Sequence, residues 1–553
     1  MGSYTYPKFV YKPPTDLMTS PPQRRPLVIV GAGPVGLAAA VDARLQGLDV
    51  LLFDEDDSVS VGSRAVCYAK RTLEILDRLG IGQPLCDKGV SWNIGRTFLQ
   101  EDEVYQFNLV PEPGHKRPGM INLQQYYLEE ALVSRALELG VDIRWKCKAV
   151  GVRNEADHAV VRIASPEGEF SIEADWLVVA DGARSPIRRM LGLDMEGQVF
   201  KDRFLIADVV MQADFPAERR LWFDPPFHRG QSVLLHKQAD NVWRIDFQLG
   251  WDADPEEETK PERVVPRIQA MLGDERAFTL EWVSIYTFQC RRMNQFKHQR
   301  LLFAGDAAHQ VSPFGARGAN SGLQDADGLM WKLALVMKGL APESLLESYN
   351  DERVYAADEN ILNSTRSTDF ITPKSPTSVL FRQAALELAR HHPFARKLVN
   401  SGRLSVPSFI THSVLNTPDV DAFAGDMLPG APMDDAPITC NGQGGWLLDQ
   451  LGHRFQCLVY VDDAAQIDAR TLRELQTLAQ DAVAVEPIVV SRQAGAVEGV
   501  TVLVDAQGLF AKRYDAQPGS AWLVRPDQHV VARWRGIHRD AIANARDRAT
   551  CNA

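Results

Sequence analysis

The sequence has few cysteines, no long apolar run and no basic tract, and each absence excludes a class of protein. Its seven cysteines are scattered without a CxxC pair, which excludes a paired-cysteine metal site and favours reduced thiols over a disulfide framework. No stretch suits a membrane span, which needs roughly 18 apolar residues. Lys and Arg total 60 against 72 Asp and Glu, a net charge of −12. Without a basic run, this balance argues against nucleic acid or anionic membrane partners.

What is present indicates a soluble, multidomain protein. Apolar residues make up 45% of the 553 residues and charged residues 24%, a composition typical of globular chains. A chain of this length is expected to form about two to four domains.

Three glycines near the start of the chain have the spacing of a dinucleotide-binding loop. Gly31, Gly33 and Gly36 form GxGxxG between an apolar, strand-like run and a helix-compatible run. Such glycines permit a tight turn, a close approach of backbone to pyrophosphate, and close helix packing. The helix then directs its free N–H groups at the phosphates. Asp54 ends the next apolar run, where a carboxylate suits a pair of ribose hydroxyls.

The same segment has a rival interpretation. Arg24 and Arg25 precede the apolar run, as in a twin-arginine export signal. Three features oppose export: the glycines fall on the fingerprint positions, Pro34 interrupts the run, and cleavage would remove the loop's own strand. We therefore expect a cytoplasmic protein.

Strand and helix patterns divide the chain into regions. Alternating α and β signals predict an α/β, Rossmann-like domain with a largely parallel sheet. A β-rich, aromatic stretch predicts an inserted sheet with a substrate pocket beside it. The predicted divisions are an extended arm at 1–25, the Rossmann-like domain at 26–200 and 296–425 with a helical extension, the inserted sheet at 201–295, a turn-rich linker at 426–438, and a separate α/β domain at 439–553.

Two further motifs follow strand-like runs. Asp181 precedes Gly182, and Asp306 follows Gly305. Alone, the first is an ordinary turn and the second an ordinary helix cap. With the glycine loop, and in this order, they resemble the FAD-binding motifs of the class A, single-component flavoprotein aromatic monooxygenases. The closer resemblance is to the 3-(3-hydroxyphenyl)propionate hydroxylase and phenol hydroxylase group.

The resemblance is specific over 26–353 and weaker over 430–535. In the second stretch it implies a thioredoxin-like C-terminal domain. That domain lacks a CxxC pair here, so the resemblance implies a structural or dimer-contacting role, in a homodimer. In the first stretch it implies non-covalent FAD contacts at Gly31, Gly33, Gly36, Asp54, Arg64, Gln125, Asp181, Gly182, Gly305, Asp306, Gly318, Ala319 and Asn320.

The resemblance also implies that the loop 313–320 faces the flavin ring, with Pro313, Arg317 and Asn320 as its catalytic contacts. The family usually has Gln and Met where Arg317 and Ala319 stand. An added positive charge favours an anionic reduced flavin or an acidic substrate, unless the side chain points outward. The candidate substrate contacts are His228, His236, Tyr286 and Phe314. The two histidines and the tyrosine are candidate bases for a phenol, and each equally suits a packing or surface role.

The implied reaction is hydroxylation of a small aromatic, phenolic molecule with NAD(P)H and dioxygen, through a flavin hydroperoxide. The cofactor carries the chemistry, while the protein orients the substrate and shields it from water. Two alternatives stay open. One is another flavoenzyme on the same scaffold, either a reductase without oxygen insertion or a halogenase, whose Trp-x-Trp-x-Ile-Pro segment is absent. The other is a non-catalytic flavin-binding interaction protein.

Overall fold

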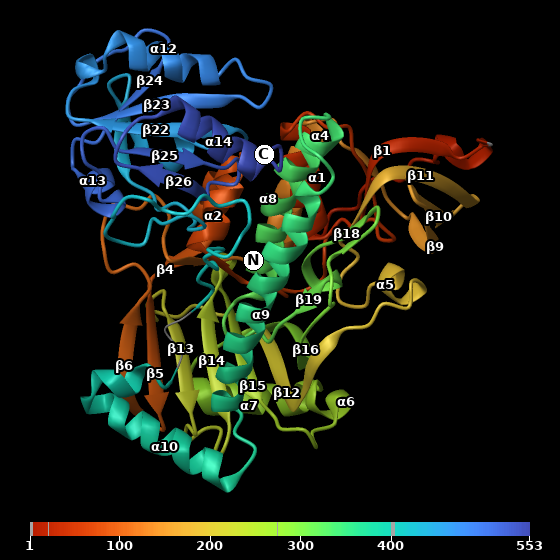
Figure 1. Cartoon of the computed structure of the whole chain (residues 1–553). Coiled ribbons are helices and arrows are strands. Elements are labelled where there is room, and N and C mark those ends of the chain that lie inside the picture. Colours follow the sequence, from red (N-terminus) through yellow and green to blue (C-terminus); the bar gives the residue numbers. More distant parts are fainter. Residues whose placement is uncertain (1–3, 20, 274, 400–403) are drawn as a thin grey trace.

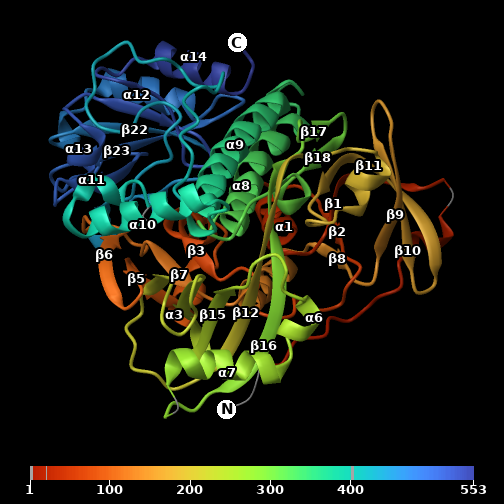
Figure 2. The same ribbon diagram turned by 90° about the horizontal axis from the view of Figure 1, so that it is seen from below.

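The structure, a computed structural model of the chain, describes residues 4–19, 21–273, 275–399 and 404–553. In these ranges the strands form three large sheets and one small sheet. The sheet that contains β1 lies at the upper right of Figure 1, the sheet that contains β12 lies below it, and the C-terminal sheet lies at the upper left in blue. The long helices α8 and α9 run between the C-terminal sheet and the sheet that contains β1 (Figures 1 and 2).

The first sheet is parallel at its centre, as the α/β pattern predicts. Strand β1 pairs in parallel with β2 and β11, and β11 pairs in parallel with β18. The apolar end of β1 is fully enclosed, with Leu27, Val28 and Ile29 at 0% exposure. Its strands are β1 (Gln23–Val30), β2 (Leu51–Phe53), β8 (Asp142–Arg144), β9 (Lys148–Asn154), β10 (Ala159–Ser165), β11 (Gly168–Val179), β17 (Lys297–His298) and β18 (Leu301–Phe303).

Helices cover this sheet closely because the first of them is rich in small residues. Helix α1 begins at Pro34, whose fixed φ suits a first helical position, and buries three consecutive alanines. It packs against both α4 and α8. The helices of this part of the molecule are α1 (Pro34–Leu45), α2 (Lys70–Arg78), α3 (Gly82–Lys88), α4 (Gln125–Glu138), α5 (Pro186–Met190), α8 (Gly318–Met337) and α9 (Leu345–Ile371).

The second sheet is larger than the 201–295 insertion predicted from the sequence. Strands β5 and β6 join it from residues 94–108, because β5 pairs in parallel with β13. They lie in the range that we assigned to the Rossmann-like domain, so that boundary needs correction. The strands are β5 (Ile94–Leu99), β6 (Asp102–Asn108), β12 (Glu196–Val210), β13 (Arg219–Phe223), β14 (Ser232–Lys237), β15 (Val242–Gln248), β16 (Thr279–Arg292) and β19 (His309–Gln310).

The two faces of the second sheet differ in chemistry. Along β15, Trp243, Ile245 and Phe247 join an apolar cluster with helix α7 (Pro261–Leu272). The intervening Arg244 and Asp246 face the opposite way, because side chains alternate along a strand, and both line a cavity. The sheet therefore turns an apolar face to its helix and a partly polar face to the interior of the molecule.

Helix α10 (Pro376–His391) also belongs with the second sheet. Its Leu386 and Ala389 share an apolar cluster with Leu99 and Phe223 of the sheet. Figure 1 shows the helix lying across the lower end of β5 and β6. The helical extension assigned to the Rossmann-like domain is therefore divided between the two sheets.

The C-terminal sheet has parallel and antiparallel parts. Strand β22 pairs in parallel with β23, and β23 with β24, whereas β25 and β26 form an antiparallel hairpin. Its elements are β20 (Pro437–Cys440), β21 (Gln443–Trp446), β22 (Phe455–Val461), β23 (Val485–Ser491), β24 (Thr501–Val504), β25 (Ala521–Val524), β26 (Val530–Trp534), α12 (Ala469–Leu478), α13 (Leu509–Tyr514) and α14 (Arg539–Ala549).

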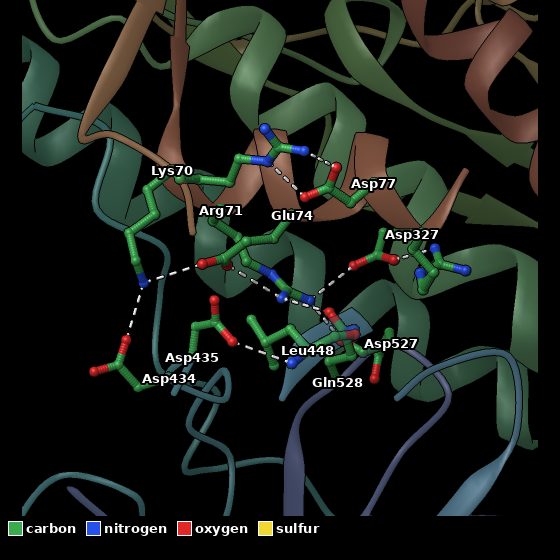
Figure 3. A network of polar contacts seen from close by, with 12 residues as sticks. Lys70, Arg71, Glu74, Asp77, Asp327, Asp434, Asp435, Leu448, Asp527 and Gln528 are labelled. Carbon is green, nitrogen blue, oxygen red and sulfur yellow. Dashed lines mark hydrogen bonds and ion pairs between the residues drawn. The ribbon is translucent and has the colours of Figure 1, made fainter. Parts of the chain in front are cut away.

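This C-terminal part shares both a core and a polar network with the first part. Trp331 of α8 packs edge-on against Phe455, with ring centroids 5.7 Å apart. Figure 3 shows the network, in which Arg71 of α2 donates to Gln528 at 3.0 Å and Lys70 reaches Asp434 at 2.9 Å. The two parts are therefore fastened together by buried contacts as well as by the chain between them.

The remaining elements are short. A small antiparallel sheet consists of β3 (Cys67–Ala69), β7 (Met120–Asn122) and β4 (Val90–Trp92), in that order. The N-terminal arm is anchored by Tyr4, which stacks on Tyr126 at 3.9 Å, and β1 begins inside the range predicted for the arm. Within the described ranges, no helix combines the length and apolar character that crossing a membrane requires. The further short helices are α6 (Pro255–Glu258), α11 (Pro393–Arg396), η1 (Thr15–Met18), η2 (Ala239–Asn241), η3 (Gly305–Ala307), η4 (Leu448–Gln450) and η5 (Ala464–Gln466).

Candidate cofactor and substrate cavity

One cavity of about 1450 Å³ joins the three sequence motifs to the second sheet. Its size exceeds the roughly 300–1,000 Å³ of a pocket for one small ligand, so it has room for a dinucleotide and a substrate together. Of the predicted site residues, those on its wall are Gly31, Gly33, Asp54, Arg64, Gln125, Asp181, Gly182, His236, Tyr286, Asp306, Pro313, Phe314, Arg317, Gly318, Ala319 and Asn320. The predicted residues that the wall does not include are Gly36, His228 and Gly305.

The glycine loop has the geometry that its spacing predicts. Gly31 has a φ of +103°, and a Cβ there would lie 2.4 Å from the Ala180 carbonyl oxygen. A Cβ on Gly36 would lie 1.9 Å from the Gly31 oxygen, so this glycine permits close packing from behind the wall. Gly33 is different, because no described protein atom lies within 4 Å of its Cβ position. The space beside Gly33 is left for a ligand at the N-terminus of α1.

Asp54 holds the glycine loop as well as lining the cavity. Its carboxylate accepts from the Ala32 N–H at 2.5 Å and from the Asp56 N–H at 2.8 Å. Burial raises the pKa of Asp54, although both backbone donors oppose the shift. Its predicted contact with a ribose therefore uses the lone pairs that these two bonds leave.

Gln125 and Glu129 form a small network at the start of α4. Gln125 accepts from the Ala65 N–H at 3.1 Å and donates to Glu129 at 2.8 Å. Glu129 also accepts from the N–H and the hydroxyl of Ser60, at 2.6 and 2.7 Å. These bonds fix the segment that carries Arg64 along the cavity wall.

Asp181 has one carboxylate oxygen in use and one without a partner. Oδ2 accepts from the Ile187 N–H at 3.1 Å, whereas Oδ1 is buried and makes no hydrogen bond within the described residues. Burial raises the pKa of this group. A buried acceptor without a partner is costly, and a donor from a bound ligand would satisfy it. Gly182, with a φ of +79°, leaves open space next to it.

Asp306 stands in the cavity on a loop that other residues hold in place. Its side chain is exposed and lines the cavity, and desolvation by the surrounding protein raises its pKa. Asp325 fixes the loop by accepting from the Gly305 N–H at 2.9 Å. Asp325 also pairs with His309 and Arg353, each at 2.6 Å. The sequence did not identify Asp325 or Arg353, because neither belongs to a short motif.

Asn320 acts on the wall of the cavity through backbone contacts. Its Oδ1 accepts from the Ala69 N–H at 2.9 Å, and its Nδ2 donates to the carbonyls of Cys67 and Ala316. Both N–H donors and one lone pair of the amide oxygen are thereby engaged. The side chain ties β3 to the loop 313–320 on the cavity wall, and its predicted contact with the flavin ring stays a prediction.

Arg317 does not point outward into solvent. It is 2% exposed, lines the cavity and precedes the first turn of α8. Phe314, three residues earlier, packs edge-on against Phe204 and Phe288, with ring centroids 4.8 and 4.9 Å apart. The loop therefore meets the second sheet through an aromatic contact, and these three rings form one wall of the cavity.

A polar row crosses the cavity face of the second sheet beside the aromatic wall. Arg244 pairs with Asp246 at 2.9 Å and donates to the Tyr286 hydroxyl at 3.2 Å. It also donates to the Arg64 carbonyl at 2.6 Å, where Arg64 has a left-handed φ of 43°. Arg244 thus connects the predicted cofactor segment to the predicted substrate wall.

The two candidate histidines have different surroundings. His236 is buried on the cavity wall, and burial, reinforced by Arg219 and Arg244, holds its pKa well below 6.5. His228 instead contacts the Gln248 carbonyl at 2.6 Å, away from the cavity. The cavity wall therefore gives no support to the prediction that His228 contacts substrate, whereas His236 is neutral near pH 7 and a weak base.

Several residues of the cavity wall could not be identified from the sequence, because strand pairing between distant parts of the chain places them there. Trp92 and Met120 reach the cavity from the small sheet, and Arg219 from β13. The alternation Arg244, Asp246, Gln248 within an otherwise apolar strand was a usable signal, since polar residues at period two mark one face of a strand.

Comparison with known proteins agrees with this geometry. The family model described as FAD binding domain matches residues 24–364, and the model described as HcaD C-terminal domain matches residues 438–548. A flavin-dependent monooxygenase of Mycobacteroides abscessus is 30% identical over 359 residues, which is 60% of this chain and 71% of the relative. A 3-(3-hydroxy-phenyl)propionate/3-hydroxycinnamic acid hydroxylase of Mycolicibacterium gilvum is 26% identical over 512 residues, 92% of this chain and 88% of the relative.

The fold has a close counterpart among solved structures. The flavin-dependent monooxygenase PieE, solved in complex with FAD and substrate, superposes with a TM-score of 0.81 at 23% identity. The superposition covers 97% of this chain and 100% of that one. At this identity the match establishes the shared fold.

Fold and site together define a flavoprotein whose dinucleotide loop, Asp-Gly segment and Gly-Asp segment open on one cavity. The chain belongs to the FAD-binding-domain family, and the predicted resemblance to FAD-dependent aromatic monooxygenases is confirmed. It is a flavoprotein oxidoreductase of the monooxygenase class that uses FAD.

Proposed function

We propose that this enzyme hydroxylates a small aromatic, phenolic molecule with NAD(P)H and dioxygen. The observation that carries the proposal is the continuity of the cavity. It runs from the three nucleotide motifs to a wall of Phe204, Phe288 and Phe314. A flat aromatic ring fits such a wall, because aromatic pairs pack in offset or edge-to-face arrangements.

Specific residues fit each part of FAD. The N–H groups at the start of α1 and the open space at Gly33 suit the pyrophosphate. The Asp306 carboxylate and the free Oδ1 of Asp181 suit hydroxyl donors. The loop 313–320, fixed by Asn320, forms the side against which the flavin ring would lie. When bound, FAD supplies the redox chemistry and the activation of dioxygen.

The protein's own contribution is orientation, exclusion of water and control of charge. Phe314 and the second sheet enclose the substrate end, and this exclusion strengthens electrostatic interactions inside. Tyr286, hydrogen-bonded to Arg244, is the residue that we propose for contact with a substrate hydroxyl. Burial raises its pKa, so it remains a neutral phenol that can donate or accept.

A panel of aromatic compounds tests the proposal. Purified holoprotein should release intact FAD on denaturation, as non-covalent binding requires. Phenolic compounds should then accelerate NAD(P)H oxidation, with a hydroxylated product of matching mass. NAD(P)H oxidation that yields only peroxide, or no acceleration by any aromatic compound, would favour the reductase alternative.

We also propose a thioredoxin-like C-terminal domain, a homodimer and a cytoplasmic location. The parallel strands β22 to β24 with the antiparallel β25 and β26 support the first. Cys440 and Cys457 lie in separate strands and stay unpaired, which suits a structural role. Light scattering tests the homodimer, and a monomer at micromolar concentration would exclude it.

A further inference from the structure

Arg219 is a buried cation on the substrate side of the cavity. It begins strand β13, is 5% exposed and lines the cavity. No hydrogen bond or ion pair of its side chain is found among the described residues. Burying a guanidinium without a partner is expensive, and burial lowers the pKa of Arg219. A ligand that carries a negative charge would supply the missing partner.

The two nearby carboxyl groups, Asp246 and Asp208, already have other partners. Asp246 lies 2.9 Å from Arg244. Asp208, which pairs with Arg244 in the register of β12 and β15, accepts from Gln238 at 3.3 Å. Burial raises the pKa of Asp208 to about 6, against the opposing pull of Arg244. Asp246 is therefore paired with Arg244 and Asp208 is bonded to Gln238, and Arg219 is left with a longer-range attraction to Asp246.

The other groups that face Arg219 are neutral. His236 is held in its uncharged form by burial and by the two arginines. Burial raises the pKa of Cys67 to about 11, so its thiol is protonated at neutral pH. Tyr105 is a phenol at the same end of the sheet. Glu218, the residue before Arg219, is charged, but its carboxylate is paired with Arg96 and Arg220 at 2.8 Å each.

The sheet places Arg219 where it can act on a substrate. Arg220 pairs with Leu235 and His236 with Arg244, so Arg219, His236 and Arg244 follow one another across three strands on the cavity face. The aromatic wall of Phe204 and Phe288 lies on the same face, farther along the strands. Arg219 and this aromatic wall therefore line the same cavity on one face of the sheet.

We propose that Arg219 binds a carboxylate carried by the aromatic substrate. The enzyme's substrate class is then a phenolic acid rather than a neutral phenol, and Arg219 is its specificity-determining residue. An arginine presents donors in a fork that matches a carboxylate bidentately. Pairing would remove the cost of an unpaired buried charge, so the free energy gained on binding the acid is large. This inference rests on the proposed function, which makes the cavity a substrate site.

Binding of matched acids and amides to the FAD-loaded, full-length protein tests the proposal. The probes are 3-hydroxybenzoate, 3-hydroxyphenylacetate and 3-(3-hydroxyphenyl)propionate, each with its primary amide. Dissociation constants are measured from the change in the visible spectrum of the flavin, and by equilibrium dialysis. In the wild-type protein at least one acid should bind about tenfold to a hundredfold more tightly than its amide.

Substitutions assign that preference to one side chain. Arg219→Met keeps the length and removes the charge, and should bring acid and amide to within about twofold while leaving amide binding unchanged. Arg219→Lys should retain part of the preference. The control is Arg220→Met, because Arg220 is the next residue on the strand, lies off the cavity wall and is paired with Glu218. Wild-type protein that prefers no acid to its amide would overturn the proposal, as would an undiminished preference in Arg219→Met.

Thermal stability separates a binding role from a structural one. Without ligand, Arg219→Met should melt at the same temperature as the wild type or higher, since it removes an unpaired buried charge. Acids should raise the melting temperature of the wild type and not that of Arg219→Met. A markedly lower melting temperature for ligand-free Arg219→Met would show a structural arginine and overturn the proposal. These measurements need no NAD(P)H and no turnover. A failure of the carboxylate site can therefore be distinguished from a failure of the proposed hydroxylation.

Discussion

Arg525 and Glu352 form a fully buried ion pair, with Nη1 and Oε1 2.7 Å apart, between the C-terminal hairpin and helix α9. Glu352 also pairs with Lys332 of α8 at 2.7 Å. Burial alone would raise the pKa of Glu352, but the two cations outweigh it and bring the value to about 2. The C-terminal domain is therefore anchored to the same helices that carry the loop 313–320 and Asp325.

Breaking this pair should destabilise the whole molecule. Arg525→Met should cost about 3–5 kcal/mol, the range for removing one partner of a buried ion pair. Urea unfolding or the melting temperature measures the loss. The matched control is Arg470→Met, which removes an exposed pair with Glu474 within one helix and should leave the stability almost unchanged, because water screens such a pair. Equal effects of the two substitutions would mean that the interdomain pair contributes nothing special.

Two glycines of the dinucleotide loop should respond differently to alanine. At Gly31 the added Cβ meets the Ala180 carbonyl at 2.4 Å in a backbone with positive φ, so Gly31→Ala should lower the melting temperature of FAD-free protein. At Gly33 the φ is −75° and the Cβ position is open, so FAD-free Gly33→Ala should melt like the wild type. Because that open space is where the pyrophosphate would lie, Gly33→Ala should still lose FAD affinity. Normal FAD affinity in Gly33→Ala would place the phosphates elsewhere.

Asp306 should bind FAD through hydroxyl donors. Asp306→Ala should weaken FAD binding by about 1.5–3 kcal/mol, the range for hydrogen bonds to a charged group. Asp306→Asn keeps the shape of the side chain without its charge, so its affinity for FAD should lie between those of the wild type and of Asp306→Ala. Fluorescence titration of apoprotein with FAD gives the dissociation constants. An unchanged constant for Asp306→Ala would remove this residue from the cofactor site.

The neutral state of His236 should appear in the pH dependence of stability. Its folded pKa lies well below the 6.5 of an unfolded histidine, because of burial and two arginines. The unfolded chain then binds more protons below about pH 6.5, so the stabilisation is present above that pH and is lost as pH falls. As the pH falls from about 7.5 to 5.5, the melting temperature of the wild type should fall further than that of His236→Asn. Parallel pH profiles would show that His236 titrates normally.

Local motifs and long-range pairing differ in how far the sequence reveals them. The glycine loop, Asp181 and Asp306 were predictable because each depends on residues adjacent in the chain and on an apolar strand before it. Strands β5 and β6 were not, because their place in the second sheet depends on the pairing of β5 with β13, more than 100 residues away. Arg219 entered the cavity wall through the same pairing, and its lack of a partner is a property of the folded sheet alone.

The directions of the Arg317 and Asn320 side chains could not be predicted from the sequence. The sequence located both in the loop that faces the cavity, but not the direction of their side chains. In the structure the Asn320 amide forms hydrogen bonds with the backbone of β3 and of the loop. Arg317 lines the cavity at the start of α8, so its predicted preference for an acidic substrate stays a prediction beside the one that we propose for Arg219.

The central claim is that the enzyme inserts oxygen into an aromatic ring, and isotopic labelling tests it most directly. Holoprotein is supplied with NAD(P)H, the phenolic compound that best accelerates NAD(P)H oxidation, and ¹⁸O-labelled dioxygen in unlabelled water. The account predicts a product heavier by one labelled oxygen atom per turnover. Turnover to a product without label would contradict it and identify the enzyme as a flavin reductase on the same scaffold.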